Sequence, residues 1–237
     1  MASRFVDYRD GDTLLQGYLA WNDAQAGPRP AVLVSHAWAG RDAFSCARAD
    51  DLARLGYVGF ALDVYGKDIR GGTVEANRAL MQPLLDDRRL LHRRLAAALT
   101  TVAAQAEVDA TRIAAIGYCF GGLCVLDLAR AGTELRGVVS FHGLLSPPDA
   151  IPNAEITAAV LVLHGHDDPM VPPEQVLAFE QEMSAAEADW QLHAYGNTVH
   201  SFTHPDADAP AHGSAYNPDA ARRAWASMKG FLEETLA

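Results

Sequence analysis

The sequence has few cysteines, few basic residues and no long uninterrupted apolar run. Three of its 237 residues are cysteines. An odd number gives no complete disulfide framework, so we expect free thiols in a reducing cytoplasm. The most apolar stretch, residues 113–128, is interrupted by Gly and Asp and predicts no membrane-spanning helix. The first residues lack a basic segment followed by an apolar run, so we expect no signal peptide.

The small number of basic residues also limits the kinds of binding partner that we expect. The chain has nineteen Lys and Arg residues and thirty Asp and Glu residues, which gives a net charge of −11. Nucleic acids and anionic membranes are bound through Lys and Arg patches, so we expect neither as a partner. Hydrophobic residues make up 49% of the chain. That fraction suffices for one large core, and we expect residues 1–237 to form a single domain.

Short apolar segments alternate along the chain with segments of helical periodicity. Such alternation predicts an α/β fold with a mainly parallel central sheet and helices on both faces. Alternating residues at 13–19 indicate antiparallel strands at the N-terminal edge. Pro83 should break or kink the long helical pattern around it, because proline lacks an amide hydrogen. The predicted strands are 32–34, 58–62, 112–116, 135–141, 159–163 and 190–195, and the predicted helices 43–55, 75–105 (one helix or two), 121–131, 173–183 and 218–236.

A Gly-Tyr-Cys-Phe-Gly-Gly motif at 117–122 lies between a predicted buried strand and a predicted helix. It matches the Gly-x-nucleophile-x-Gly elbow, with cysteine as the nucleophile. The glycines allow the backbones of the sharp turn to approach, and the helix N-terminus favours a thiolate at Cys119. The alternative is a buried thiol that only packs, which is the interpretation we prefer for Cys46 and Cys124.

The acid of such a site follows the nucleophile in the chain, and the histidine follows the acid. Asp167 and Asp168 both follow the predicted strand 159–163. Successive residues of an extended segment point in opposite directions, so one of them should face the histidine. We favour Asp168, because the proline after it holds it extended.

Two histidines follow the last predicted strand, His200 and His204. We favour His200 as the base, because it lies between apolar residues, whereas His204 begins a segment rich in Asp, Ala and Pro. We interpret His36, His142 and His164 as hydrogen-bonded structural histidines. No metal site is predicted, since His-x-His at 164–166 lacks a matching second pair of ligands.

An oxyanion hole requires two backbone amides. The amide of Phe120, directly after the nucleophile, should supply one. We expect the other from Trp38, in the loop after the strand 32–34.

Three motifs together resemble the dienelactone hydrolase family. They are the elbow at 117–122, the His-Gly-x-x-Asp-Pro-x-Val-Pro segment ending at Pro172, and Tyr-Gly-x-x-x-His-Ser-Phe ending at Phe202. The resemblance implies an α/β-hydrolase fold, a Cys119-Asp168-His200 triad and no cofactor. It also implies hydrolysis of a small ester or lactone through an acyl-enzyme.

The chain departs from the family pattern at two positions. Where the family carries a glutamate that helps to activate the cysteine, this chain has Ala37. Where the family carries an arginine for the substrate carboxylate, this chain has His204, although Ser201 is retained. By this resemblance Ser201 and His204 are candidate substrate-binding residues, and we expect an ester or lactone other than dienelactone.

Two other functions are compatible with the motifs. Cys119 could serve a redox or thiol-transfer protein, with Cys124 as a resolving cysteine, although five residues along a helix place the two on different faces. A catalytically lapsed α/β-hydrolase could instead act as a binder, which the loss of glutamate at Ala37 would favour.

Overall fold

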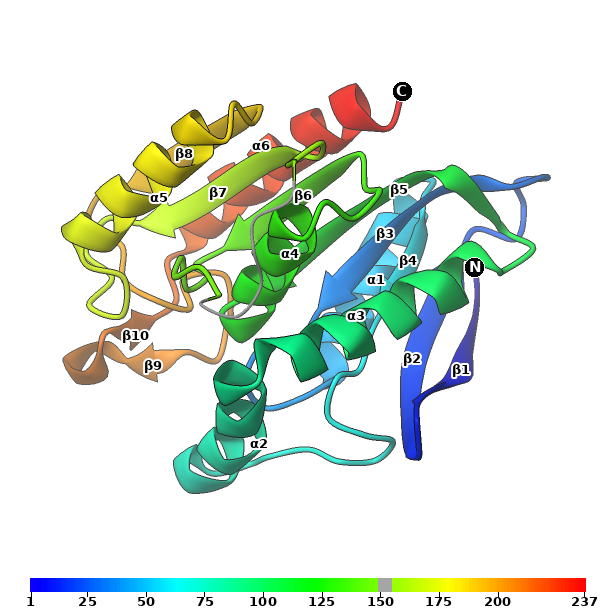
Figure 1. Cartoon of the computed structure of the whole chain (residues 1–237), viewed down its shortest axis with the longest axis horizontal. Coiled ribbons are helices and arrows are strands. Elements are labelled where there is room, and N and C mark those ends of the chain that lie inside the picture. Colours follow the sequence, from blue (N-terminus) through cyan, green and yellow to red (C-terminus); the bar gives the residue numbers. More distant parts are fainter. Residues whose placement is uncertain (149–154) are drawn as a thin grey trace. The chain divides into compact units, whose positions relative to one another are not determined.

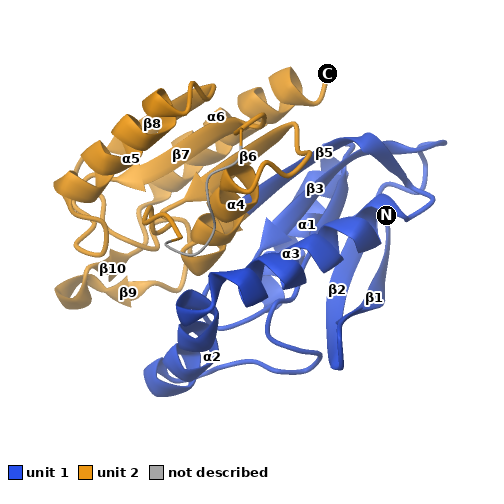
Figure 2. Ribbon diagram, viewed as in Figure 1, with its two compact units in different colours: residues 1–116 blue, residues 117–237 orange. Residues whose placement is uncertain are grey.

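A computed structural model describes residues 1–148 and 155–237 of the chain. The chain divides into two compact units, Met1–Ile116 and Gly117–Ala237 (Figure 2). Its eight-stranded mixed sheet has the order β1-β2-β4-β3-β5-β6-β7-β8. The prediction of an α/β fold with a mainly parallel sheet and flanking helices is confirmed, and that of a single domain stays a prediction.

The first unit holds the antiparallel edge of the sheet. Strand β1 pairs antiparallel with β2, β2 pairs antiparallel with β4, and β3 runs parallel to β4. Helix α1 packs on β2, β3 and β4, and α3 covers the other face (Figure 1). The elements are β1 Ala2–Asp10, β2 Thr13–Trp21, β3 Arg29–Ser35, α1 Ala43–Arg54, β4 Val58–Ala61, α2 Val74–Asp86, α3 Arg88–Ala103 and β5 Val108–Tyr118, whose last two residues enter the second unit.

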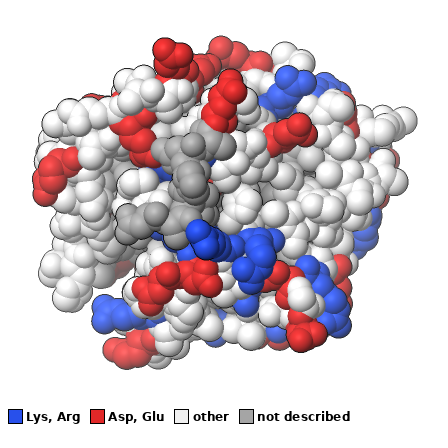
Figure 3. Space-filling model, in the orientation of Figure 1, with Lys and Arg blue, Asp and Glu red and all other residues white. Residues whose placement is uncertain are grey.

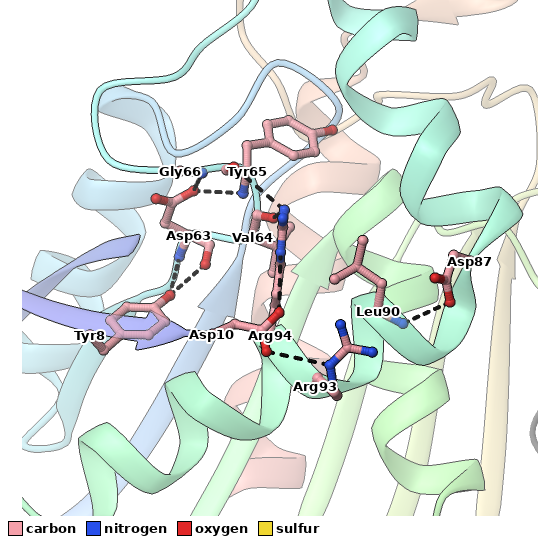
Figure 4. Close-up of polar contacts among 10 residues, drawn as sticks. All are labelled: Tyr8, Asp10, Asp63, Val64, Tyr65, Gly66, Asp87, Leu90, Arg93 and Arg94. Atoms are coloured by element: carbon pink, nitrogen blue, oxygen red, sulfur yellow. Dashed lines mark hydrogen bonds and ion pairs between the residues drawn. The ribbon is translucent and has the colours of Figure 1, made fainter. Parts of the chain in front are cut away.

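The long helical pattern forms two helices, but the break is not at Pro83. That proline lies inside α2, and the chain leaves the helix at Asp87, whose side chain accepts a hydrogen bond from the Leu90 amide at 2.9 Å and begins α3 (Figure 4). Ala79, whose carbonyl would pair with an amide at position 83, lies in an exposed turn. Water can therefore satisfy that carbonyl, while the Asp87 cap ends one helix and starts the next.

A buried polar network fixes the loop after β4 (Figure 4). The Tyr8 hydroxyl donates to the Asp63 carbonyl and accepts from the Asp63 amide. The Asp63 carboxylate accepts from the amides of Tyr65 and Gly66 at 2.8 and 3.1 Å. From α3, Arg94 donates to the Val64 carbonyl at 2.6 Å. Strand β1 and helix α3 thus hold the start of this loop in one conformation.

The second unit contains parallel strands and a short hairpin. Strands β6, β7 and β8 are parallel neighbours, α4 packs on β6, and α6 packs on β6 and β7 (Figure 1). Every residue of α4 is buried. The elements are α4 Phe120–Arg130, β6 Gly137–Phe141, β7 Ala159–Gly165, α5 Pro173–Ala185, β8 Trp190–Tyr195, β9 Asp208–Ala209, the 3₁₀ turn Pro210–His212, β10 Ser214–Ala215 and α6 Pro218–Thr235.

Arg130, at the end of α4, anchors that helix to α5. Its guanidinium makes two 2.8 Å hydrogen bonds to the Glu182 carboxylate and a third, also 2.8 Å, to the Leu145 carbonyl. Arg130 is 1% exposed, and a buried guanidinium is tolerated when such partners satisfy it. Among the described residues, no helix is long and apolar enough to cross a bilayer.

Candidate active site

Cys119 forms the turn between β5 and α4. Its backbone has φ +56° and ψ −118°, a conformation that residues other than glycine rarely adopt. The Cys119 amide donates to the Phe141 carbonyl at 3.0 Å, which holds the turn against the end of β6. The thiol is half-buried and lies at the N-terminus of α4, where the helix dipole favours negative charge. The strand-turn-helix predicted at 117–122 is confirmed.

Backbone crowding explains the glycines around Cys119. A Cβ at Gly117 would lie 1.9 Å from the Gly121 carbonyl oxygen. A Cβ at Gly122 would lie 2.6 Å from the Gly143 Cα. Both distances are far below contact, so the turn can form only with glycine at these positions.

His200 and Asp168 form a buried pair. His200 Nδ1 lies 2.7 Å from Asp168 Oδ2, and both residues are at most 3% exposed. The other Asp168 oxygen accepts the Met170 amide at 2.8 Å, so the carboxylate is held at both ends. The neighbouring Asp167 instead accepts the Thr198 amide at 3.1 Å. The structure thus brings Asp168, rather than Asp167, to the imidazole.

The surroundings of His200 favour its charged form. Burial lowers the pKa of the imidazole, but the negative charge of Cys119 and the hydrogen bond with Asp168 outweigh it and raise the pKa to about 10. An imidazolium beside a thiolate is the resting state expected of a cysteine nucleophile activated by histidine.

The β9–β10 hairpin braces the backbone of His200. The His200 amide donates to the Gly213 carbonyl at 3.0 Å, and the His200 carbonyl accepts the Ala215 amide at 3.1 Å. Gly213 has φ +72°, and a Cβ there would lie 2.1 Å from Pro169, next to Asp168. The segment that begins at His204 therefore supports the histidine, although apart from Gly213 its residues up to Ala215 are accessible. Its sequence signal was a glycine that follows a turn-forming Pro-Ala-His.

The two candidate substrate-binding residues follow His200. Ser201 is half-buried with φ +58°, and His204 Nδ1 accepts the Asp206 amide at 3.3 Å. Both belong to the segment that carries the imidazole, and their role toward a substrate stays a prediction.

The residues proposed from the first unit are held by their own neighbours. His36 Nδ1 donates to the Ala37 carbonyl at 2.6 Å, and the Tyr65 hydroxyl donates to the Trp38 carbonyl at 3.0 Å. The peptide between Ala37 and Trp38 is thereby fixed. A share of the Trp38 amide in an oxyanion hole with Phe120 stays a prediction.

None of the three cysteines, all of which lie in the described part of the chain, is in a disulfide bond. Cys124 is fully buried within α4, whereas Cys119 is partly accessible. Among residues 1–148 and 155–237, no group of three His, Cys, Asp or Glu side chains is arranged to hold a metal ion.

A strand-turn-helix elbow in a mostly parallel sheet, followed in the chain by an aspartate and a histidine in contact, defines an α/β-hydrolase. The chain belongs to the dienelactone hydrolase family, whose model matches residues 15–236. It is accordingly a dienelactone hydrolase-like hydrolase.

Similar proteins carry related names. The chain is 40% identical in sequence to the dienelactone hydrolase-like promiscuous phosphotriesterase P91 from metagenomic libraries. Its structure matches the crystal structure of P91 with a TM-score of 0.94, over 100% of this chain and 99% of that one. It is 29% identical to a "Probable 2-oxo-3-(5-oxofuran-2-ylidene)propanoate lactonase" of Bradyrhizobium sp, over 95% of this chain and 91% of the relative. The dienelactone hydrolase of Anabaena variabilis, 20% identical with a TM-score of 0.68 over 98% and 97% of the two chains, shares the fold.

Proposed function

We propose that this hydrolase cleaves a small carboxylic ester or lactone, with Cys119 as nucleophile, His200 as acid and base, and Asp168 as the residue that orients His200. The observation that carries the proposal is the 2.7 Å contact between His200 and Asp168, together with the position of Cys119 on the strained turn at the N-terminus of α4. A cysteine on the elbow, a histidine and a buried carboxylate are the parts that covalent acyl transfer requires.

The reaction has two stages. The Cys119 thiolate attacks the carbonyl carbon and forms a C–S bond, while the carbonyl electron pair moves to the oxygen. The Phe120 amide, with Trp38 as the proposed second donor, would stabilise this oxyanion. Its collapse breaks the ester bond, and the His200 imidazolium protonates the departing alkoxide. The resulting thioester holds the acyl group on Cys119.

The second stage returns the enzyme to its resting state. Neutral His200 now takes a proton from water, and the hydroxide attacks the thioester carbonyl. The carboxylic acid leaves, Cys119 is again a thiolate, and His200 again carries the proton. Asp168 keeps Nδ1 protonated throughout, so that Nε2 exchanges the proton.

The substrate should differ from dienelactone. Ala37 offers no carboxylate to activate the thiol, and His204 is a weaker partner for a substrate carboxylate than arginine. A neutral aryl ester or an uncharged lactone fits these two positions better than an anionic lactone.

A phosphotriester is a second candidate substrate. The 40% identity to P91 over essentially the whole of both chains favours it. Attack of the Cys119 thiolate on phosphorus, with loss of an aryloxide, would use the same nucleophile and base.

Hydrolysis of p-nitrophenyl acetate, a butyrolactone and a neutral aryl phosphotriester tests the proposal in the wild type and in the Cys119→Ala variant. We expect loss of all turnover in Cys119→Ala at an unchanged melting temperature, and wild-type rates in the control Cys46→Ala, which removes another partly accessible thiol. Full ester hydrolysis by Cys119→Ala would refute the role of this cysteine.

The same samples separate the two other functions. A redox protein would form a Cys119–Cys124 disulfide after peroxide treatment, detectable by thiol titration. A lapsed enzyme that only binds would be alkylated by iodoacetamide, and esters would protect Cys119 without being turned over.

A further inference from the structure

A second buried imidazole lies against His200. His142 directly follows β6, is 2% exposed, and has φ +38°, a conformation that costs free energy in a residue other than glycine. Its ring meets the His200 ring edge-on at a centroid distance of 5.1 Å and the Phe202 ring edge-on at 5.2 Å. The side chain therefore contacts the segment 200–203 from the side of β6.

One hydrogen bond fixes the ring of His142. Its Nε2 lies 2.8 Å from the Thr203 hydroxyl. Among the described residues, the buried Nδ1 has no hydrogen-bond partner. The contact with Thr203 is therefore the polar interaction that decides how this ring is turned, and it joins two segments that lie 61 residues apart in the sequence.

The two imidazoles prefer opposite charge states. Burial lowers the pKa of His142 well below its ordinary value, and the charges of His200 and His204 lower it further. The thiolate and Asp168 raise the pKa of His200. A neutral ring thus lies beside a charged one. The edge contact can persist while the charge of His200 changes, because His142 does not compete for the proton.

We propose that His142 is a positioning residue. Together with Thr203, it holds the His200 ring in the orientation that lets this ring interact with both Cys119 and Asp168. This inference rests on the proposed function. During the reaction His200 alternates between imidazolium and imidazole, and in the neutral form its attraction to both partners weakens. A fixed ring on its flank, tied to the residue three positions later, prevents rotation at that stage.

Two matched substitutions remove the hydrogen bond from either side. His142→Phe keeps an aromatic ring against His200, and Thr203→Val keeps the shape of the threonine. We expect each to lower kcat by about 10- to 100-fold with KM little changed, as for a small displacement of a catalytic group. The double variant should lose no more than either single one, because both delete the same interaction.

Two further variants test whether the hydroxyl is the cause. Thr203→Ser keeps the hydroxyl and should therefore retain the kcat of the wild type. Ser227→Ala removes the hydroxyl that lies 3.2 Å from His193 Nδ1 in the same unit, and should leave kcat unchanged. A wild-type kcat in Thr203→Val, or losses that multiply in the double variant, would overturn the proposal. If His142→Phe does not fold, Thr203→Val and Thr203→Ser decide the question.

A spectroscopic measurement separates this inference from the proposed function. The far-downfield proton resonance of the His200–Asp168 hydrogen bond can be assigned by its loss in Asp168→Ala. We expect it to shift or broaden in Thr203→Val at an unchanged melting temperature, and a resonance unaffected by Thr203→Val would count against positioning. If Cys119→Ala retained activity, the proposed function would fail, while this resonance would still report whether Thr203 and His142 orient His200.

Discussion

At Cys119 the backbone adopts a strained conformation that places a thiol at the start of a buried helix. Strain of this kind is kept only where the surroundings determine it, and here the Phe141 carbonyl and the adjacent glycines do so. His200 is equally constrained, with Asp168 on one ring nitrogen and hairpin hydrogen bonds on its backbone. At the scale of single residues, Cys119 and Asp168 are therefore the side chains that should control the charge of His200.

The charge of His200 should depend on the thiolate. A pKa raised to about 10 means that the folded chain binds this proton more tightly than the unfolded chain does. The contribution of this proton to stability is therefore complete below the ordinary value of about 6.5 and is lost as the pH rises through the folded value. In an NMR titration we expect His200 of the wild type to titrate near 10, and His200 of Cys119→Ala at a lower pH. Identical titrations in the two proteins would contradict the ion pair.

The two adjacent aspartates should differ sharply in effect. Asp168→Asn removes the charge beside His200 and permits the wrong tautomer, so kcat should fall by about 10²- to 10⁴-fold. Asp167→Asn weakens a hydrogen bond to the Thr198 amide and should change kcat by less than about tenfold, since it does not touch the imidazole. Steady-state kinetics on one aryl ester would measure both, and equal losses would argue against the assignment of Asp168.

At the scale of elements, the β9–β10 hairpin is the support of the histidine. It contributes two backbone hydrogen bonds to His200, and Gly213 packs directly on Pro169, which precedes Met170 and follows Asp168. The loop that carries Asp168 and the segment that carries His200 are thus in contact through Gly213. A shift of the hairpin would therefore move both His200 and the segment of Asp168.

Gly213→Ala tests this support. The new methyl group would overlap Pro169 and would sit at φ +72°, so we expect a loss of about 1–3 kcal/mol in the free energy of unfolding. We also expect a fall in kcat. The control is Gly230→Ala inside α6, where no atom lies within 4 Å of the added carbon. That change should stabilise the fold by about 0.5–1 kcal/mol through helix propensity. Thermal denaturation of both variants would reveal whether the opposite signs hold.

The elements whose residues carry a regular pattern could be predicted from the sequence. The alternation of apolar strands and amphipathic helices, the elbow and the antiparallel N-terminal strands followed from periodicity and glycine positions. The Asp87 cap was hidden by an uninterrupted helical pattern, in which Pro83 was the more obvious breaker. The short hairpin 208–215 has no periodicity, and the contact of His142 with Thr203 depends on tertiary structure. The preference for Asp168 over Asp167 came from local geometry, since proline fixes the direction of the residue before it.

At the scale of the whole molecule, the net charge acts on a substrate before it reaches the site. The net charge of −11 arises from an excess of carboxylates, and Figure 3 shows acidic and basic side chains interspersed on the face that it draws. An anionic substrate is repelled on approach by the net charge, whereas a neutral ester is not.

Ionic strength should therefore separate the two kinds of substrate. We expect kcat/KM for a carboxylate-bearing aryl ester to rise between low salt and 0.1 M salt, where the Debye length falls to about 10 Å. The value for p-nitrophenyl acetate should stay constant. A fall for the charged ester would instead indicate a local positive field at the site, with His204 as the first residue to substitute.

The position of the elbow along the chain has a consequence for recombination. Gly117 marks the boundary between the two units, and Cys119, Asp168 and His200 all follow it. Trp38, Ala37 and the loop after β4 all precede it. A single crossover near the end of β5 would exchange the N-terminal loops between two family members while each recipient inherits the three proposed reacting residues intact. Gene shuffling at this one junction would therefore keep the three proposed reacting residues on one inherited segment, while it exchanges Trp38, the proposed second oxyanion donor.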